Sequence, residues 1–294
     1  MKIGIIGGGA IGLLFAGYLQ KNHQVMIYTR TVEQKLNLLK HGLYITKDQH
    51  TSQIEVEAKL MDEWKGDDDL TLITVKQYQL PQVMEKIVAQ GNQENSFLFL
   101  QNGMGHLKWL EKLVANNIYV GTVEHGAIRE SNNHVRFTGK GKTKLAIYHG
   151  EDSLLTKLME PVNPEFPFEV EEDYYEMLIS KLIINAVINP LTAVLKVKNG
   201  ELVNNPYYYR VLIQVFEEVI DVLQIHNRSR YFGQLLQVCR NTAANRSSML
   251  KDIEENRQTE VDSILGYLLE KALKEERKAP LLMAFYHCVK GSEQ

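Results

Sequence analysis

A glycine-rich turn near the start of the chain constrains the fold more than any other feature. Residues 7–12 read Gly-Gly-Gly-Ala-Ile-Gly, which is the pattern G-x-G-x-x-G. An apolar run at residues 3–6 precedes the turn, and apolar residues spaced for one face of a helix follow it at positions 11, 14, 15, 18 and 19. This strand, turn and helix predict a βαβ start of the kind that binds a dinucleotide.

The glycines of the pattern have separate expected roles. Gly7 permits the tight turn, Gly9 lets the backbone approach a pyrophosphate, and Gly12 lets the helix pack closely on the strand. The helix N-terminus then presents free N–H groups to the anion. The alternative is a glycine-rich turn without a ligand. The residues expected to contact the coenzyme here are Gly7, Gly8, Gly9, Ala10, Ile11 and Gly12.

The end of the second predicted strand, residues 24–29, indicates which dinucleotide is bound. An NAD site usually carries Asp or Glu about 20 residues beyond the loop, whereas residues 13–32 contain no acidic side chain. Arg30 stands there instead, and its guanidinium can clamp a 2′-phosphate. We therefore expect NADP(H), with a solvated surface arginine as the alternative reading.

The wider pattern predicts an α/β protein, with an N-terminal Rossmann-type dinucleotide-binding domain followed by an all-helical C-terminal domain. Further strands are expected as continuous apolar runs, typical of a parallel sheet covered on both faces, at residues 70–75, 97–100 and 118–121. Residues 134–138 and 143–148 are interpreted as a hairpin, and 166–170 as a closing strand. Long helical patterns follow at residues 175–194, 206–223 and 261–273. The predicted domains are residues 1–170 and 171–294.

Polar residues directly follow two of the expected strands. Lys76 comes after the strand at 70–75, and Gln101-Asn102-Gly103 comes after the strand at 97–100. Open parallel sheets bind ligands at the carboxyl ends of their strands. We therefore expect Lys76 and Asn102 to meet coenzyme or substrate, with ordinary loop residues as the alternative.

An apolar helical segment in the second half carries three polar residues at a spacing of four. Lys181, Asn185 and Asn189 follow one side of this helix, which predicts a hydrogen-bonding wall rather than a charged surface face. An ordinary exposed stripe is the alternative. Pro190 predicts a kink or break beside the stripe.

A second polar segment runs from Asn245 to Asp262. Ser247 or Ser248 can simply cap a helix, and Glu260 can simply favour a helix dipole. The segment gains meaning beside Lys181, because a lysine acid and a glutamate that tunes it would form a proton-transfer pair.

Composition excludes several classes of function. A net charge of −3 over 294 residues argues against a nucleic-acid partner. The cysteines, Cys239 and Cys288, are too few for a disulfide framework or a zinc site, so we expect no metal. The N-terminal apolar run is too short for a signal peptide, and no later window approaches eighteen uncharged apolar residues. We expect a cytoplasmic protein with no membrane partner.

Taken in order, these motifs resemble the ketopantoate reductase (2-dehydropantoate 2-reductase) family over nearly the whole chain. The resemblance rests on residues 7–12, Gln101-Asn102-Gly103, Lys181-Leu182 with Asn185, Asn189-Pro190-Leu191-Thr192-Ala193, Asn199-Gly200-Glu201-Leu202, and Ser247-Ser248-Met249 leading to Thr259-Glu260-Val261-Asp262. It implies NADPH-dependent reduction of 2-dehydropantoate to (R)-pantoate in the pathway to pantothenate and coenzyme A, with an active site between the two domains.

The resemblance also implies roles for single residues. Lys181 becomes the general acid and Glu260 its catalytic partner, while hydride passes from nicotinamide C4 to the ketone carbon. Substrate contacts are expected at Asn102, Asn185, Asn189, Asn245 and Ser248. Coenzyme contacts beyond the glycine loop are expected at Arg30, Lys76, Asn102 and Glu260.

The chain departs from the family pattern in two places. Ile179 stands where many members have Trp, and the spacing of Gly and Pro is altered at residues 274–280. A second reading is therefore an NADPH-dependent reductase of another branched 2-keto acid. A third is a non-catalytic NADPH-binding sensor, although a sensor does not need a proton donor. The oligomeric state stays open, with a homodimer through the helical half as one candidate.

Overall fold

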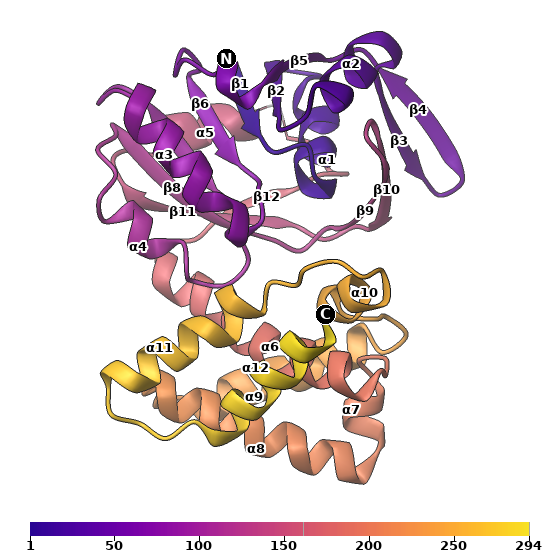
Figure 1. Ribbon diagram of the computed structural model, residues 1–294, viewed down its shortest axis with the longest axis vertical. Coiled ribbons are helices and arrows are strands. Elements are labelled where there is room, and N and C mark those ends of the chain that lie inside the picture. The colour runs from indigo at the N-terminus through magenta and orange to yellow at the C-terminus, as the bar shows by residue number, and fades with distance from the viewer. Residues whose placement is uncertain (161, 294) are drawn as a thin grey trace. The chain divides into compact units, whose positions relative to one another are not determined.

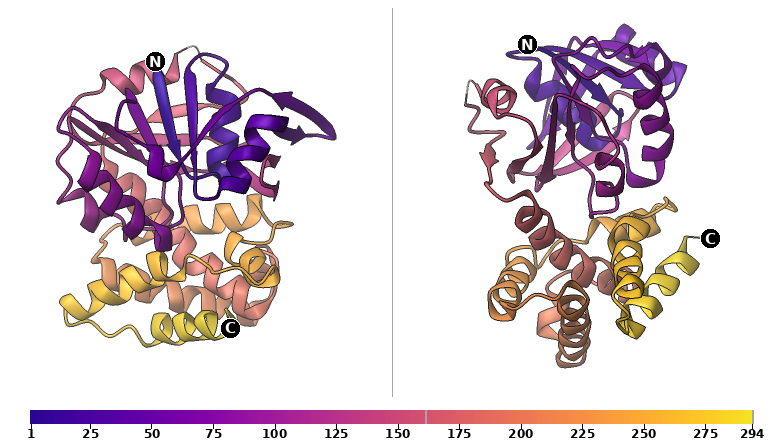
Figure 2. Two further views of the ribbon diagram at one scale, coloured as in Figure 1. Left: turned by 45° about the horizontal axis from the view of Figure 1, so that its top comes forward. Right: turned by 90° about the vertical axis from the view of Figure 1, so that its left-hand side faces the viewer.

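The computed structural model describes residues 1–160 and 162–293, which form two units (Figures 1 and 2). The first unit contains Met1–Gln101 and Lys108–Met177, and the second contains Asn102–Leu107 and Leu178–Gln294. The expected domain boundary between residues 170 and 171 therefore lies within the first unit. Residues 102–107, which were expected in the first domain, group with the second unit.

An eight-stranded sheet forms the centre of the first unit. Its order is β12-β11-β8-β7-β6-β1-β2-β5, and all neighbouring strands are parallel except β8 and β11. The strands are β1 (Lys2–Ile6), β2 (Gln24–Thr29), β5 (Glu57–Leu60), β6 (Leu70–Ile73), β7 (Ser96–Phe99), β8 (Asn117–Val123), β11 (Thr143–His149) and β12 (Phe168–Val170). The chain order reverses at β1, so the carboxyl ends of β1 and β6 form the switch point where such sheets bind ligands.

A second sheet of four strands covers the first helix, α1 (Ala10–Leu19). Its order is β4-β3-β10-β9, with the bounds β3 (Leu43–Lys47), β4 (His50–Ile54), β9 (Gly126–Ser131) and β10 (His134–Gly139). Helix α1 contacts β1 and β2 of the large sheet and β3, β9 and β10 of the small one. Because both sides are covered, α1 is buried nearly all round rather than on the single face expected from its apolar spacing.

The interpretation of residues 134–148 as one hairpin is wrong. Strand β10 pairs with β9 and β3, whereas β11 pairs with β8 and β12 in the other sheet. The hairpin in this region joins β9 to β10 around Asn132 and Asn133. Gly139–Lys142 instead carries the chain from one sheet to the other, because turn residues change the direction of a chain without choosing its partner strand.

The other helical segments of the first unit are shorter. They are α2 (Val32–His41), α3 (Leu80–Gln90), α5 (Ser153–Met159) and the 3₁₀ turns η1 (Met61–Glu63) and η2 (Gln77–Gln79), while α4 (Leu107–Leu110) starts at the edge of the 102–107 segment. Thr31 begins α2 because its side chain accepts a hydrogen bond from the Gln34 backbone N–H.

The second unit is helical over its described residues. Its elements are α6 (Tyr174–Leu195), which starts just before the unit, then α7 (Glu201–Asn204), α8 (Pro206–Leu223), α9 (Arg228–Asn241), α10 (Ser248–Glu254), the π-helix η3 (Asp262–Gly266), α11 (Tyr267–Lys274) and α12 (Pro280–Ser292). Helix α8 matches the predicted range. Its start is strongly encoded, because Asn205 caps the backbone N–H groups of Tyr207 and Tyr208, and Pro206 occupies the first turn.

We expect a kink or break at Pro190; helix α6 continues through this residue, so the helix does not break there. The proline removes one backbone donor, yet Val187, Ile188 and Leu191 around it are buried in the core of the unit. Packing of these side chains holds the helical geometry that the isolated sequence disfavours.

The same helix comes closer to a membrane span than we expected. By length and composition alone α6 could cross a membrane, with a mean hydropathy of 1.7 over its most apolar window. However, 67% of that window is buried within the protein. Such burial is typical of a core helix, whose apolar side chains face protein rather than lipid.

Candidate active site

The glycine-rich turn lies at the switch point of the large sheet. Gly7 follows β1 with a φ of +120°, a conformation that side-chain-bearing residues rarely adopt. Its backbone N–H donates to the carbonyl of Tyr28 on β2, at 3.1 Å. Thr74, just past β6, places its hydroxyl 3.0 Å from the Gly7 carbonyl oxygen. The turn is therefore tied to the strands on both sides of β1.

The other two pattern glycines differ in what surrounds them. A Cβ on Gly12 would lie 1.8 Å from the Gly7 carbonyl oxygen and 2.6 Å from the Thr74 hydroxyl, so α1 starts where only glycine fits. A Cβ on Gly9 would meet no heavy atom within 4 Å. Gly9 also precedes α1 without a side-chain cap, and the first turn of α1 has no acidic residue. This open cradle at a helix N-terminus fits the pyrophosphate of a dinucleotide.

The cations predicted for the coenzyme follow β2 and β6, the two strands that flank β1. Arg30 directly follows β2 and is exposed, so its guanidinium can reach an anion in solution. Lys76 is half-buried and immediately precedes η2. Gln101 is structural, because its amide donates to the carbonyls of Ile73 and Val75 at 2.8 and 3.0 Å. These bonds hold the segment that leads to Lys76.

In the second unit, the 102–107 segment packs against the residues that begin η3. Asn102 donates from Nδ2 to Glu260 Oε2 at 2.8 Å, which brings together two of the predicted site residues. A Cβ on Gly103 would lie 2.1 Å from the Ser263 carbonyl oxygen, so the backbones approach closely. His106 is fully buried in this segment, and burial lowers the pKa of its imidazole to about 4. The ring is therefore neutral at neutral pH.

The three side chains of the polar stripe on α6 differ in how far they are buried. Lys181 and Asn185 are half-buried, whereas Asn189 is only 7% exposed. An ordinary exposed stripe would leave all three in solvent, and a buried asparagine needs hydrogen-bond partners. The end of the stripe at Asn189 therefore lies in the interior of the second unit.

The 245–248 segment is fastened to the same helix. The Thr192 hydroxyl lies 2.7 Å from the Ser247 hydroxyl, which also accepts a hydrogen bond from the Leu250 backbone N–H and thus caps α10. Ser248 then begins α10 and is exposed, as is Asn245. The capping alternative is correct for Ser247. It leaves the Ser248 hydroxyl available for a ligand beside the C-terminal end of α6.

Comparison with known proteins places the chain in a family. The model of "Ketopantoate reductase PanE/ApbA" matches residues 3–150, and that of "Ketopantoate reductase PanE/ApbA C terminal" matches residues 173–293. The chain belongs to the ketopantoate reductase family. A 2-dehydropantoate 2-reductase from Bacillus subtilis (strain 168) is 41% identical over 100% of this chain and 98% of its own length. One from Listeria innocua is 38% identical, over 100% of this chain and 97% of its own length.

Solved structures agree with the ketopantoate reductase fold. The crystal structure of panE from Bacillus subtilis has a TM-score of 0.92 and 40% identity, and covers 99% of this chain and 100% of that one. A D-mandelate dehydrogenase in a ternary structure with NADH and anilino(oxo)acetate has a TM-score of 0.88 at 24% identity, covering 100% of this chain and 98% of that one. At that identity the likeness shows the fold alone.

Two residues near the predicted sites, Gln34 and Arg129, had no signal in the sequence of this ketopantoate reductase family member, and both contact the glycine loop. Thr192 stands in the motif at residues 189–193 but had no role assigned to it; its hydroxyl joins α6 to Ser247. Thr74 is different, because it is the last residue but one of the strand predicted at residues 70–75, and its position alone could have drawn attention. Among the described residues, no group of three or more His, Cys, Asp or Glu side chains could hold a metal ion.

Proposed function

We propose that this protein reduces 2-dehydropantoate to (R)-pantoate with NADPH. The observation that carries the proposal is full-length identity of 41%, 38% and 37% to three 2-dehydropantoate 2-reductases, since such identity covers the coenzyme loop and the helical unit together. The open cradle at Gly9 supports the choice of a dinucleotide coenzyme. When bound, NADPH supplies the hydride for the C2 ketone.

The proposed roles of the protein's own residues follow from their chemistry. Lys181 donates a proton to the ketone oxygen, and its positive charge stabilises the developing alkoxide. Glu260 is the catalytic partner of Lys181 and contacts the coenzyme. Asn102 supports this assignment, because its amide already holds the Glu260 carboxylate. The remaining proposed substrate contacts are Asn102, Asn185, Asn189, Asn245 and Ser248.

The coenzyme contacts in this proposal are the loop residues 7–12 together with Arg30, Lys76, Asn102 and Glu260. Arg30 is the residue that would distinguish NADPH from NADH. Its exposed guanidinium follows β2, where a Rossmann-type fold places the adenosine ribose. Lys76 adds a second positive charge at the end of the β6 segment.

Arg30→Ala is expected to weaken NADPH binding roughly 10- to 100-fold, the equivalent of one lost charged hydrogen bond of about 1.5–3 kcal/mol. NADH affinity should stay nearly constant, because NADH has no 2′-phosphate. Fluorescence titration with both coenzymes measures this directly. Lys40→Ala, at the far end of α2, is the control for the same change in net charge. Equal weakening of both coenzymes would contradict the role of Arg30.

The function itself is tested by NADPH oxidation with and without 2-dehydropantoate. We expect rapid NADPH oxidation that depends on the substrate. The loss of the near-ultraviolet absorbance of NADPH measures the rate. Tight NADPH binding without turnover would favour another branched 2-keto acid or the sensor reading. A panel of branched 2-keto acids distinguishes these two, because a sensor reduces none of them. Ile179 motivates the panel, since a change in pocket shape alters discrimination by about 1–3 kcal/mol per methylene.

We further propose that the protein acts in the cytoplasm, where a biosynthetic reductase meets its coenzyme. The expected homodimer through the helical half stays a prediction. Light scattering of the purified protein, coupled to size-exclusion chromatography, gives the mass of the assembly and decides between monomer and dimer.

A further inference from the structure

The carbonyl of Gly8, inside the glycine loop, is held by a buried side chain of the next helix. Gln34 on α2 donates from Nε2 to the Gly8 carbonyl oxygen at 2.7 Å and to the Asn132 carbonyl oxygen at 2.8 Å. A glutamine amide has two N–H donors, so each carbonyl can take one of them. Gln34 is only 5% exposed. It therefore joins the loop to the turn of the β9–β10 hairpin.

The first turn of α2 is fixed at two further points. Thr31 caps the Gln34 backbone N–H, and Asn132 Nδ2 donates to Glu33 Oε1 at 2.9 Å. The β9–β10 turn thus contacts two consecutive residues of α2. These contacts leave the Gln34 amide little freedom to leave the Gly8 carbonyl.

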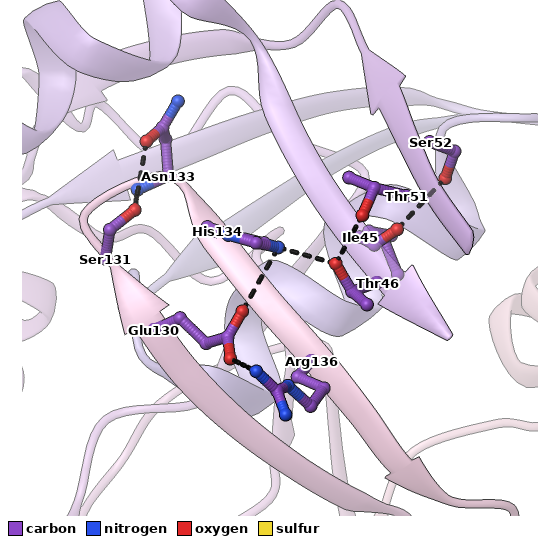
Figure 3. A network of polar contacts seen from close by, with 9 residues as sticks. All are labelled: Ile45, Thr46, Thr51, Ser52, Glu130, Ser131, Asn133, His134 and Arg136. Carbon is purple, nitrogen blue, oxygen red and sulfur yellow. Dashed lines mark hydrogen bonds and ion pairs between the residues drawn. The ribbon is translucent and has the colours of Figure 1, made fainter. Parts of the chain in front are cut away.

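The small sheet holds the β9–β10 hairpin in place (Figure 3). His134 on β10 lies between Thr46 of β3, at 2.7 Å, and Glu130 of β9, at 3.3 Å. Arg136 pairs with the same Glu130 carboxylate. Within the turn, Asn133 Nδ2 donates to the Gly42 carbonyl oxygen at 2.8 Å. The acceptor that Gln34 uses on the hairpin, the Asn132 carbonyl, therefore lies in a turn whose two strands are both held in the small sheet.

A second donor reaches the same carbonyl. Arg129 on β9 places Nη1 3.3 Å from the Gly8 carbonyl oxygen, so that oxygen accepts from both a neutral amide and a guanidinium. In a trans peptide the C=O and the following N–H point in opposite directions. Holding the Gly8 oxygen toward Gln34 and Arg129 consequently turns the Gly9 N–H away from them.

We propose that Gln34 is a positioning residue that sets coenzyme affinity, because it holds the Gly8–Gly9 peptide in the orientation that presents the Gly9 N–H to the coenzyme pyrophosphate. This inference rests on the proposed coenzyme use. Gln34 touches neither coenzyme nor substrate in this scheme. Its contribution is preorganisation, which removes an ordering cost from binding.

Gln34→Met keeps the size of the side chain and removes both donors. Affinity for NADPH and NADH should fall together, each roughly tenfold, as expected for two lost hydrogen bonds of modest net strength. The kcat at saturating coenzyme should stay within about twofold, because the reacting groups are untouched. Lys35→Met is the matched control: it changes the next residue of α2, removes an ion pair with Glu63 and leaves the loop contacts intact.

Two readouts separate positioning from a merely structural role. The first is the pattern across coenzymes: Gln34→Met acts on both, whereas Arg30→Ala acts on NADPH alone. The second is amide hydrogen exchange of residues 7–12 in the coenzyme-free protein, which should become faster in the variant. If Gln34→Met does not fold, Gln34→Glu replaces it. We again expect weaker binding of both coenzymes, because the ionised carboxylate cannot donate a hydrogen bond to either carbonyl oxygen.

Unchanged coenzyme affinity with unchanged loop exchange would overturn the proposal. A lower Tm with unchanged affinity would overturn it as well, since Gln34 would then stabilise the fold only. Failure of the unmodified protein to bind either dinucleotide is a different result. It would refute the proposed function, and with it the stated purpose of the Gln34 contact. If instead the unmodified protein binds the coenzyme and Gln34→Met binds it equally well, this inference alone is refuted.

Discussion

Lys181→Ala is expected to lower kcat by about two to four orders of magnitude, the range that follows loss of a general acid. The ammonium group of this half-buried lysine is the proposed source of the proton for the ketone oxygen. Without it, the alkoxide that forms on hydride transfer has neither a proton donor nor a nearby positive charge. NADPH affinity should stay nearly unchanged, because the glycine loop and Arg30 are intact.

Steady-state kinetics with saturating coenzyme and substrate measures this effect. Lys271→Ala on α11, which removes an ion pair with Glu275 at 3.5 Å, is the control for losing a lysine from the same unit. Lys181→Arg keeps the charge but holds its proton too tightly to donate it. Low turnover in Lys181→Arg would identify proton donation as the main contribution. Normal turnover in Lys181→Ala would remove Lys181 from the mechanism.

Gly12→Ala is expected to have the second large effect, on stability and coenzyme binding together. The new methyl carbon would lie 1.8 Å from the Gly7 carbonyl oxygen, which belongs to the backbone and cannot rotate away. The β1 turn or the start of α1 has to move. Overpacking of this kind costs about 1–3 kcal/mol, and we expect the upper end. Because the moved backbone is the anion cradle, coenzyme affinity should fall by about two orders of magnitude, equivalent to about 3 kcal/mol.

Gly9→Ala is the matched control within the same loop. Its φ of −80° suits alanine, and no heavy atom lies within 4 Å of the added carbon. The unfolding free energy should therefore change by less than about 0.5 kcal/mol, the usual range for substitutions that disturb no contact. Coenzyme binding should still weaken, because the methyl group occupies the open cradle. Denaturant unfolding and coenzyme titration give both quantities. Normal stability in Gly12→Ala would show that the turn relaxes more easily than its geometry implies.

Local sequence signals predicted several elements closely. The range of β2 agrees at both ends with residues 24–29, and α8 agrees with residues 206–223. Both are strongly encoded: β2 by a continuous apolar run, and α8 by an asparagine cap followed by proline. The βαβ start and the helical second half were predictable for the same reason, since each depends on a short stretch of chain.

The small sheet was not predictable in this way. Strand β4 is polar and largely exposed, so it carries no apolar pattern. Strand β10 pairs with β3, whose sequence lies far upstream, whereas β11 pairs with β8 and β12 in the large sheet. The small sheet covers α1, which explains why α1 is buried on more faces than its apolar spacing suggested.

For the candidate site, local sequence patterns indicated the glycine turn, the arginine after β2 and the polar stripe of α6, because each lies within a short stretch of chain. Tertiary structure alone decided three contacts: Gln34 with Gly8, Arg129 with Gly8, and Asn102 with Glu260. Their partners lie 26, 121 and 158 positions apart in the chain. Such contacts depend on how strands pair and helices pack over the whole unit, and no local pattern of residues encodes that.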